Sequence, residues 1–541
     1  MPHDLPDLAT FERLIRASAG GNLVPMFRRL LADQITPVLA YRRLVRPDDR
    51  LAPSFLCESV VGGERIGRYS FLAAQPRAQI IAYDRLVRII DSRSPDTPGK
   101  TREFHSDDPL AEPDRFIAGW KLVRVPGLPT FTGGWMGVAG YDTVRYLEGE
   151  KLPAPPADDR HLPDLHMGLY DQVVAFDHVQ KTVLAITHVH LDEYGSIQQA
   201  YEAGQARLEE LVRRIEAPPG DVKAGEPELT VGDVDLDSPP PKLPISNMGQ
   251  GGYQQAVLKA KEYIKAGDIF QVVPSQRFEL TTHADPFDIY RALRVVNPSP
   301  YMFYLQIQGA MLIGSSPEIL CRVHEGVVTN RPLAGTRRRG RDEAEDQALE
   351  AELLADPKER AEHIMLVDLG RNDVGRVAVP GSIALPQVMT IERYSHVMHI
   401  SSTVTGKLAP GRTCWDALRM ALPVGTVSGA PKVRAMQIID ELEATRRGPY
   451  AGGVGYTDFA GNMDIALALR TMVVMPGRGH VNAQRTTQGV SVHRDPPWIV
   501  HLQAGGGIVA DSDPDAEHQE TVNKAAALAK AVALAEQAFR R

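Results

Sequence analysis

The chain has 541 residues, with 60 Lys and Arg against 68 Asp and Glu and a formal net charge of −8. A chain of this length normally forms more than one domain. The negative net charge gives no overall attraction to nucleic acid or to anionic membranes. Partners of both kinds are therefore not expected. The three cysteines are too few for a disulfide framework and none lies in a C-x-x-C spacing, which favours a reducing compartment.

The first part of the chain, residues 1–215, is dominated by predicted strands. Its beginning lacks a basic segment followed by an apolar run, so no secretory signal is expected and the predicted location is cytoplasmic. Alternating or β-branched segments bounded by turn residues predict strands at 69–75, 78–84, 85–91 and 182–191.

Residues 216–246 are rich in proline, glycine and acidic residues and have no periodicity, which predicts an exposed linker. Beyond it, residues 247–541 form a second predicted region in which helices and strands follow each other irregularly. Helices are predicted at 252–266, 344–368, 414–422, 431–444 and 515–539, and strands at 301–307, 310–316 and 464–474. This order predicts an α+β fold with mainly antiparallel sheets.

Two pairs of glutamates stand out in the second region. Glu359 and Glu362 are three residues apart on a predicted helix, and so are Glu517 and Glu520, with Lys524 one turn later. Taken alone, the second pair is also typical of a helix N-terminus and of a routine i, i+4 ion pair. Four carboxylates that meet in the fold would instead form an all-oxygen site suited to Mg²⁺ and an anionic substrate.

Other segments supply groups that bind anions. The run QAGGG at 503–507 can present backbone N–H groups to a ligand, because glycine lets the chain approach closely. Arg470 lies in the alternating run 464–474, which would direct its guanidinium to one sheet face, where it can bind a carboxylate with two hydrogen bonds.

Long segments of the chain carry a resemblance to a known family. In the second region they are GDIFQVVPSQRF (267–278), NPSPYMFY (297–304), GSSPE (314–318), RPLAGTRRRG (331–340), EHIMLVDLGRNDVGRV (362–377), SHVMH (395–399), GTVSGAPKVRAM (425–436), PYAGGVGY (449–456), ALRT (468–471), QAGGGIVADSD (503–513) and ETVNKA (520–525). In the first region they are TPVLAY (36–41), LCES (56–59), GRYSF (67–71) and FTGGWMGVAGYD (131–142). These segments resemble the chorismate-utilising enzymes and, over nearly the full chain, the anthranilate synthase component I family.

This resemblance implies a fold of packed antiparallel β-sheets flanked by helices. It also implies a Mg²⁺-dependent reaction in which ammonia attacks carbon 2 of chorismate and the hydroxyl at carbon 4 leaves. Pyruvate is then eliminated and the ring becomes aromatic, which gives anthranilate. This reaction is the first step of tryptophan biosynthesis.

The resemblance also assigns roles to individual residues. It implies that Glu362 and Glu520 are magnesium ligands, with Glu517 and the catalytic Glu359 contacting metal-bound water. It implies that Glu318 is the acid that protonates the departing hydroxyl. His399 would assist proton removal at carbon 2, the alternative being a structural histidine that orients its neighbours. The substrate-binding residues implied are Thr426, Tyr450, Arg470, Gly505, Gly507 and Lys524.

Two substrate-site positions discriminate among relatives. Ala334 stands where synthases of 4-amino-4-deoxychorismate often carry a nucleophilic lysine, so amination at carbon 2 is favoured. Gln271 stands where isochorismate and salicylate synthases use a lysine to activate water, and an amide cannot act as that base. A relative that stops at the aminated intermediate is excluded less firmly.

The family implies a separate source of nitrogen and a site for feedback control. No cysteine of the chain lies in the glycine-rich turn of a glutamine amidotransferase, so an amidotransferase subunit (component II) in a hetero-oligomer, or free ammonia, is expected to supply the nitrogen. Glu58 and Ser59 match the family's tryptophan-inhibition site. It is completed by Pro300, Tyr301 and Met302, with Val454 and Tyr456 as further candidates. The region 1–215 is therefore predicted to be regulatory.

Two other functions stay open from the sequence. One is the synthesis of 4-amino-4-deoxychorismate. The other is a tryptophan-binding regulatory subunit without catalysis, which the presence of the full set of implied catalytic residues disfavours.

Overall fold

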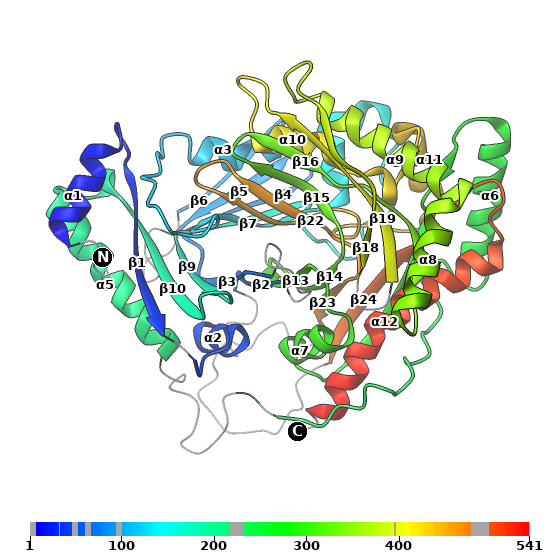
Figure 1. Ribbon diagram of the computed structural model, residues 1–541, viewed down its shortest axis with the longest axis horizontal. Helices are drawn as coiled ribbons and strands as arrows, with labels where there is room; N and C mark the ends of the chain where they lie inside the picture. Colours follow the sequence, from blue (N-terminus) through cyan, green and yellow to red (C-terminus); the bar gives the residue numbers. More distant parts are fainter. Residues whose placement is uncertain are drawn as a thin grey trace.

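The computed structural model describes residues 7–31, 33–45, 52–59, 67–92, 100–216, 229, 231–393, 397–477 and 497–539. Two large antiparallel sheets pack face to face, and helices cover both outer faces (Figure 1). The predicted α+β class is confirmed. In these parts of the chain, no helix combines the length and apolarity needed to cross a membrane.

The first sheet has ten strands from both ends of the sequence. In spatial order they are β1 (Leu23–Leu31), β10 (Thr182–His190), β9 (Gln172–Asp177), β3 (Tyr69–Ala74), β2 (Ser54–Glu58), β13 (Tyr301–Ile307), β14 (Ala310–Ser316), β23 (Thr471–Pro476), β24 (Trp498–Gly505) and β12 (Ser275–Thr282).

The second sheet has twelve strands. In spatial order they are β17 (Leu333–Arg338), β19 (Val397–Lys407), β16 (Val327–Asn330), β15 (Ile319–His324), β22 (Met463–Leu467), β21 (Gly453–Asp458), β7 (Gly134–Ala139), β8 (Leu165–Tyr170), β4 (Ala78–Tyr83), β5 (Leu86–Asp91) and β6 (Lys100–His105), with β18 (Ala384–Arg393) also paired to β19. A small separate sheet joins β11 (Gln271–Val272) to β20 (Gly429–Ala430).

Strands from both sides of the predicted linker pair with each other in both large sheets. β2 pairs with β13, and β7 pairs with β21. The predicted regions 1–215 and 247–541 therefore share both sheets, and their boundary describes the order of the chain rather than two separate folding units. Residues 217–228 and 230 of the predicted linker lie outside the described residues, and residues 231–251 form neither helix nor strand.

Apolar side chains form three layers of core that follow this architecture. One cluster lies between the sheets, and one lies under each layer of helices. The ten-stranded sheet is covered by α1 (Leu8–Ala17), α2 (Pro37–Leu44), α5 (Ile197–Glu216), α7 (Pro286–Val296) and α12 (Pro514–Ala538). The twelve-stranded sheet is covered by α3 (Glu112–Phe116), α4 (Arg145–Glu148), α6 (Gly252–Ala266), α9 (Pro357–Gly375), α10 (Cys414–Ala421) and α11 (Lys432–Leu442), and α8 (Glu343–Ala355) packs on β17 and β19.

Two predicted elements are each divided in the structure. The helix predicted at 344–368 is two helices, α8 and α9, because the Asp356 side chain accepts hydrogen bonds from the first backbone N–H groups of α9 and Pro357 occupies its first turn. The strand predicted at 464–474 is also two elements, β22 and β23. The chain passes from the twelve-stranded to the ten-stranded sheet between them, and Arg470 adopts a left-handed φ of 47° there.

Candidate active site

The candidate site lies where the chain passes twice between the two sheets. The first passage joins β14 to β15 and carries Glu318, and the second joins β22 to β23 and carries Arg470. The passages are tied together, because the Leu467 N–H donates to the Glu318 carbonyl at 3.0 Å and the Ser315 N–H donates to the Arg470 carbonyl at 3.1 Å. We call this place the crossover site. Arg470 is therefore not on a strand face as predicted, but in a strained turn of the kind found at binding sites.

Glu318 is the most deeply buried carboxyl group of the crossover site. Its side chain is 6% exposed and accepts a hydrogen bond of 3.2 Å from the Thr426 hydroxyl. Burial raises the pKa of Glu318 to about 8, although the Thr426 hydrogen bond acts in the opposite direction. At neutral pH the group is therefore an acid with a proton to give.

His399 on β19 is held in one orientation by β17. Its Nδ1 lies 3.0 Å from the Gly335 carbonyl oxygen and 3.1 Å from the Thr336 hydroxyl. Because the carbonyl can only accept, Nδ1 carries the proton and Nε2 carries the lone pair of the neutral ring. Burial, together with the charge of Arg470, lowers the pKa of His399. The ring is thus neutral at pH 7 and suited to accept a proton.

Two glycines of the predicted anion-binding run lie against predicted substrate-binding side chains. A Cβ atom on Gly505 would lie 2.9 Å from the Tyr450 hydroxyl, and one on Gly507 would lie 2.7 Å from Nε2 of Gln271. The Lys524 ammonium donates to the Gly505 carbonyl at 3.1 Å. Burial raises the pKa of Tyr450 to about 12, so the phenol stays neutral and can donate a hydrogen bond.

Glu362 of α9 and Glu520 of α12 lie close enough for their charges to interact. Burial and the charges of Glu359 and Glu520 raise the pKa of Glu362, and burial and Glu520 raise that of Glu517. The negative charges of these carboxylates repel one another, so a cation bound among them would be stabilised.

The side chains of the four glutamates offer carboxylate oxygens, the type of ligand that Mg²⁺ prefers. In the described part of the chain, no three His, Cys, Asp or Glu side chains are gathered closely enough to hold a metal. Glu359 pairs instead with Arg337 at 3.1 Å, and Glu520 pairs with Lys524 at 2.6 Å.

The two discriminating positions lie close to other predicted site residues, Ala334 to His399 and Gln271 to Gly507. Ala334 is buried on β17, next to the carbonyl that orients His399, and it presents no amine. Gln271 begins β11, and its Oε1 is buried without a hydrogen-bond partner among the described residues. That orphaned acceptor is suited to a donor from a ligand.

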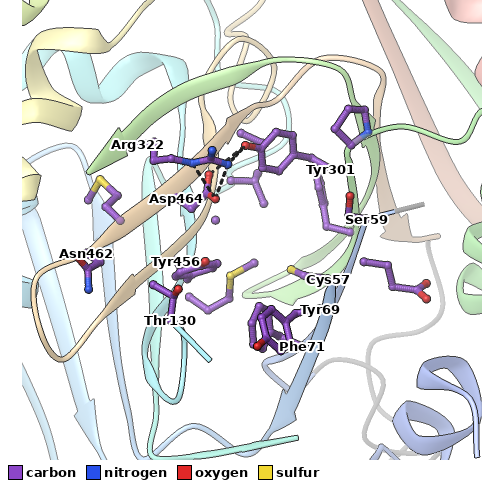
Figure 2. Close-up of a pocket in the computed structure, with 18 of the residues that line it drawn as sticks. Cys57, Ser59, Tyr69, Phe71, Thr130, Tyr301, Arg322, Tyr456, Asn462 and Asp464 are labelled. Atoms are coloured by element: carbon purple, nitrogen blue, oxygen red, sulfur yellow. Dashed lines mark hydrogen bonds and ion pairs between the residues drawn. The ribbon is translucent and has the colours of Figure 1, made fainter. Parts of the chain in front are cut away.

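A second candidate site is a cavity of about 660 Å³ between the two sheets, which we call the inter-sheet pocket (Figure 2). All five predicted inhibitor residues line it, and so do Val454 and Tyr456. The five are Glu58, Ser59, Pro300, Tyr301 and Met302.

Two carboxylates of the inter-sheet pocket, those of Glu58 and Asp464, already form ion pairs. The Glu58 carboxylate is bonded to α7, through the Tyr290 hydroxyl at 2.7 Å and the Arg294 guanidinium at 2.7 Å, so its charge is already compensated. At the other side, Arg322 on β15 pairs with Asp464 on β22 at 2.8 Å (Figure 2).

Arg322 and Asp464 line the pocket but were missed from the sequence. They are partners across two strands that lie far apart along the chain, and local periodicity carries no signal for such a pairing.

Comparison with known proteins places the chain in a family. The family model described as chorismate binding enzyme matches residues 65–530. The chain is 53% identical over 531 residues to anthranilate synthase alpha subunit 1, chloroplastic, of Oryza sativa subsp. indica, covering 97% of this chain and 90% of that protein. It is 45% identical to anthranilate synthase component 1 of Pseudomonas aeruginosa, covering 97% and 99%.

A solved structure agrees with these sequence comparisons. The crystal structure of anthranilate synthase component I from Streptococcus pneumoniae matches with a TM-score of 0.70 and 35% identity, covering 92% of this chain and 98% of that one. The chain therefore belongs to the chorismate-binding enzymes and, within them, to the anthranilate synthase component I family, so it is an enzyme that acts on chorismate.

Proposed function

We propose that this enzyme makes anthranilate and pyruvate from chorismate and ammonia, with Mg²⁺, and that tryptophan inhibits it. The observation that carries the proposal is Glu318, a buried acid with a pKa of about 8 beside the Arg470 turn. Protonation of a poor leaving group is the task for which such a raised pKa is suited. Ala334 and Gln271 favour amination at carbon 2 over the lysine-dependent reactions of relatives.

In this mechanism, Arg470, Tyr450, Lys524 and the N–H group of Gly507 bind the carboxylates of chorismate and position its ring. Ammonia forms a bond to carbon 2 while the double bonds of the ring shift and the C–O bond at carbon 4 breaks. Glu318 gives its proton to the departing hydroxyl, which leaves as water.

Elimination completes the reaction. His399 accepts the proton from carbon 2 as the C–O bond to the enolpyruvyl group breaks, and the ring becomes aromatic. The enolate released by this cleavage takes up a proton at its terminal carbon and becomes pyruvate. Glu362 and Glu520 would hold the magnesium ion, with Glu359 and Glu517 contacting its water, and the ion would neutralise the ring carboxylate.

The direct test is to identify the products formed by the purified chain from chorismate, Mg²⁺ and ammonium at mildly alkaline pH. We expect fluorescent anthranilate and pyruvate in equal amounts, and no turnover after a chelator removes the metal. A nonfluorescent aminated product that keeps its pyruvyl group would contradict the proposal, because elimination would then be absent or amination would occur at carbon 4.

Replacing Arg470 with leucine should raise the KM for chorismate by about 10-fold to 100-fold, since a charge-assisted hydrogen bond to a carboxylate contributes about 1.5–3 kcal/mol. Steady-state rates with varied chorismate measure this effect. Arg470→Lys serves as the control, because it keeps the positive charge and should recover part of the loss. An unchanged KM in Arg470→Leu would remove Arg470 from the substrate site.

The nitrogen donor is proposed to be a separate glutamine amidotransferase subunit in a hetero-oligomer, with free ammonia as a substitute. Burial raises the pKa of all three thiols, to about 12 for Cys321, and the thiolate needed to attack glutamine is disfavoured in each. The enzyme has no membrane or nucleic-acid partner in this proposal, and its proposed location is cytoplasmic.

The inter-sheet pocket is proposed to bind tryptophan. Tyr456 and Met302 offer apolar surface for an indole ring, and the Ser59 hydroxyl is buried without a hydrogen-bond partner among the described residues. The pocket is also connected to the crossover site. Arg322 lies on β15, which begins directly after Glu318, and Asp464 lies on β22, which ends just before Arg470.

Tryptophan at 100 times its Kd should stabilise the wild-type protein by about 2.7 kcal/mol. Ser59→Leu should abolish this stabilisation, because a branched side chain would fill part of the cavity. Thermal unfolding of both proteins with and without tryptophan measures the effect. An equal rise in unfolding temperature in both proteins would place tryptophan outside the inter-sheet pocket.

A further inference from the structure

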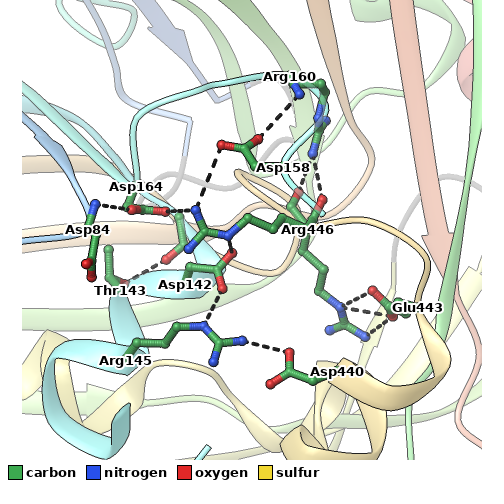
Figure 3. Close-up of polar contacts among 12 residues, drawn as sticks. Asp84, Asp142, Thr143, Arg145, Asp158, Arg160, Asp164, Asp440, Glu443 and Arg446 are labelled. Atoms are coloured by element: carbon green, nitrogen blue, oxygen red, sulfur yellow. Dashed lines mark hydrogen bonds and ion pairs between the residues drawn. The ribbon is translucent and has the colours of Figure 1, made fainter. Parts of the chain in front are cut away.

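A buried ion pair contacts segments that carry predicted substrate-site residues. Glu443 and Arg447 follow α11 and are 6% and 2% exposed. Nη2 of Arg447 lies 2.6 Å from a carboxylate oxygen of Glu443, and its Nε donates to both carboxylate oxygens at 3.1 and 3.0 Å. Figure 3 shows Glu443 in the polar network of this region.

The pair also binds two backbone segments that are far apart along the chain, residues 273–275 and Val427. Arg447 donates to the Val427 carbonyl through Nη1 and to the Val273 carbonyl through Nη2, each at 2.6 Å. Glu443 accepts from the Ser275 N–H at 2.7 Å and from the Ser275 hydroxyl at 2.9 Å. One buried charge pair therefore fixes the spacing between these segments.

Each of these segments carries groups assigned to the substrate site. Val427 follows Thr426, which hydrogen-bonds Glu318, and Val273 lies two residues after Gln271. Ser275 in turn accepts a 2.8 Å hydrogen bond from Gln503, two residues before Gly505.

The pair reaches Tyr450 as well. The guanidinium carbon of Arg447 lies 5.5 Å from the centre of the Tyr450 ring, and the Tyr450 N–H donates to the Arg447 carbonyl at 3.3 Å.

Stability alone does not explain this arrangement. Two charges taken out of water lose their hydration, and a well-packed apolar pair of similar volume is often as stable or more stable. A planar guanidinium, by contrast, can bind a carboxylate and two carbonyl oxygens in fixed directions, which a lysine ammonium does not reproduce.

We propose that Arg447, oriented by Glu443, is a positioning residue of the chorismate site, which sets the places of Thr426, Gln271 and Tyr450. This inference rests on the proposed function, since those residues are assigned to the site through it. Arg447 acts through its neighbours and takes no part in proton transfer.

A second buried pair in the same network supplies a matched control. Arg145 lies 2.7 Å from Asp440, three residues before Glu443, and their side chains are 10% and 4% exposed (Figure 3). Among the described residues, the hydrogen bonds of Arg145 reach Asp142, Pro153 and Asp440, and none of these belongs to the segments that carry the substrate-binding residues.

The experiment compares Arg447→Lys, Arg447→Met and the uncharged double variant Glu443→Gln/Arg447→Met with the controls Arg145→Met and Asp440→Asn. For each full-length protein it measures the unfolding temperature, the Kd for chorismate by calorimetry, and kcat and KM with ammonium. We expect Arg447→Lys to lose about 100-fold in kcat/KM and to bind chorismate more weakly, because small displacements of positioning groups have effects of that size. The controls should unfold at a lower temperature than the wild type but keep the wild-type Kd and KM.

The pH profile is a readout that a purely structural role would not move. If Thr426 is displaced in Arg447→Lys, its hydrogen bond to Glu318 is lost and the pKa of Glu318 rises further. The alkaline decline of kcat/KM should then begin at a higher pH than in the wild type. Arg447→Met leaves the Glu443 charge buried without its partner and can fail to fold, whereas the double variant removes both charges. The double variant should therefore unfold near the wild-type temperature but still bind chorismate more weakly than the wild type.

The inference is overturned if Arg447→Lys keeps the wild-type Kd, kcat and KM, or if the double variant recovers affinity together with stability. It is also overturned if the controls lose as much affinity for the same loss of unfolding temperature. If the wild-type chain binds chorismate but releases no anthranilate, the proposed function fails, while the comparison of Kd values still decides the role of Arg447.

Discussion

Replacing Glu318 with glutamine is expected to lower kcat by between about 10²-fold and 10⁴-fold, the range that a positioned general acid contributes. Glutamine keeps the shape of the side chain and can still accept the hydrogen bond from Thr426, but it has no acidic proton. The hydroxyl at carbon 4 would then have to leave without protonation. Anthranilate release at saturating chorismate, ammonium and Mg²⁺ measures kcat.

Two controls separate loss of the proton from loss of the fold. The unfolding temperature of Glu318→Gln and its Kd for chorismate should stay close to those of the wild type. In the wild type, kcat/KM at a fixed concentration of free ammonia should fall about tenfold per pH unit above the Glu318 pKa of about 8, because the acid is then ionised. The variant should lack this decline, and a wild-type rate that instead rises through pH 8 would contradict the role as an acid.

Local sequence patterns predicted the class of fold and several of its elements well. The helix predicted at 252–266 coincides with α6, and the strands predicted at 301–307 and 310–316 coincide with β13 and β14. In each case the apolar residues within one segment indicate the element: their helical spacing indicates α6, and their continuous runs indicate the buried strands β13 and β14. Such patterns extend over one element, so they predict where an element forms but not which strand it pairs with.

Features that depend on distant segments could not be predicted in this way. The division of the run 464–474 at Arg470 reflects a passage between two sheets, and the alternation of apolar residues continues on both sides of it. Likewise, the ion pair between Glu58 and Arg294 of α7 joins segments that are far apart along the chain, so no local pattern indicates it. The site residues themselves were assigned by resemblance, and their catalytic roles stay predictions.

Replacing Glu362 with glutamine is also expected to have a large effect. It should change the unfolding temperature, relative to the wild type, in opposite directions without and with Mg²⁺. Without Mg²⁺ the variant should unfold at a higher temperature than the wild type. Burial and the charges of Glu359 and Glu520 raise the pKa of Glu362 above its unfolded value, so its ionised form destabilises the folded protein at neutral pH. A neutral amide removes that unfavourable charge.

With Mg²⁺ the order should reverse. Loss of a group that only orients a metal ligand lowers metal affinity by about 10-fold to 100-fold, and loss of a carboxylate ligand itself should lower it at least as much. The rise in unfolding temperature that Mg²⁺ gives the wild type should therefore be absent in the variant at the same concentration, and anthranilate formation should require far more metal.

Asp368→Asn is the matched control for this experiment. Asp368 lies on the same helix but pairs with Arg371 at 2.9 Å on the exposed surface, so its substitution also removes one carboxylate from α9. It should change neither the metal-free unfolding temperature nor the response to Mg²⁺. If Glu362→Gln and Asp368→Asn respond to Mg²⁺ alike, the glutamate carboxylates of α9 and α12 do not hold the ion, and the cation required by the reaction must bind elsewhere.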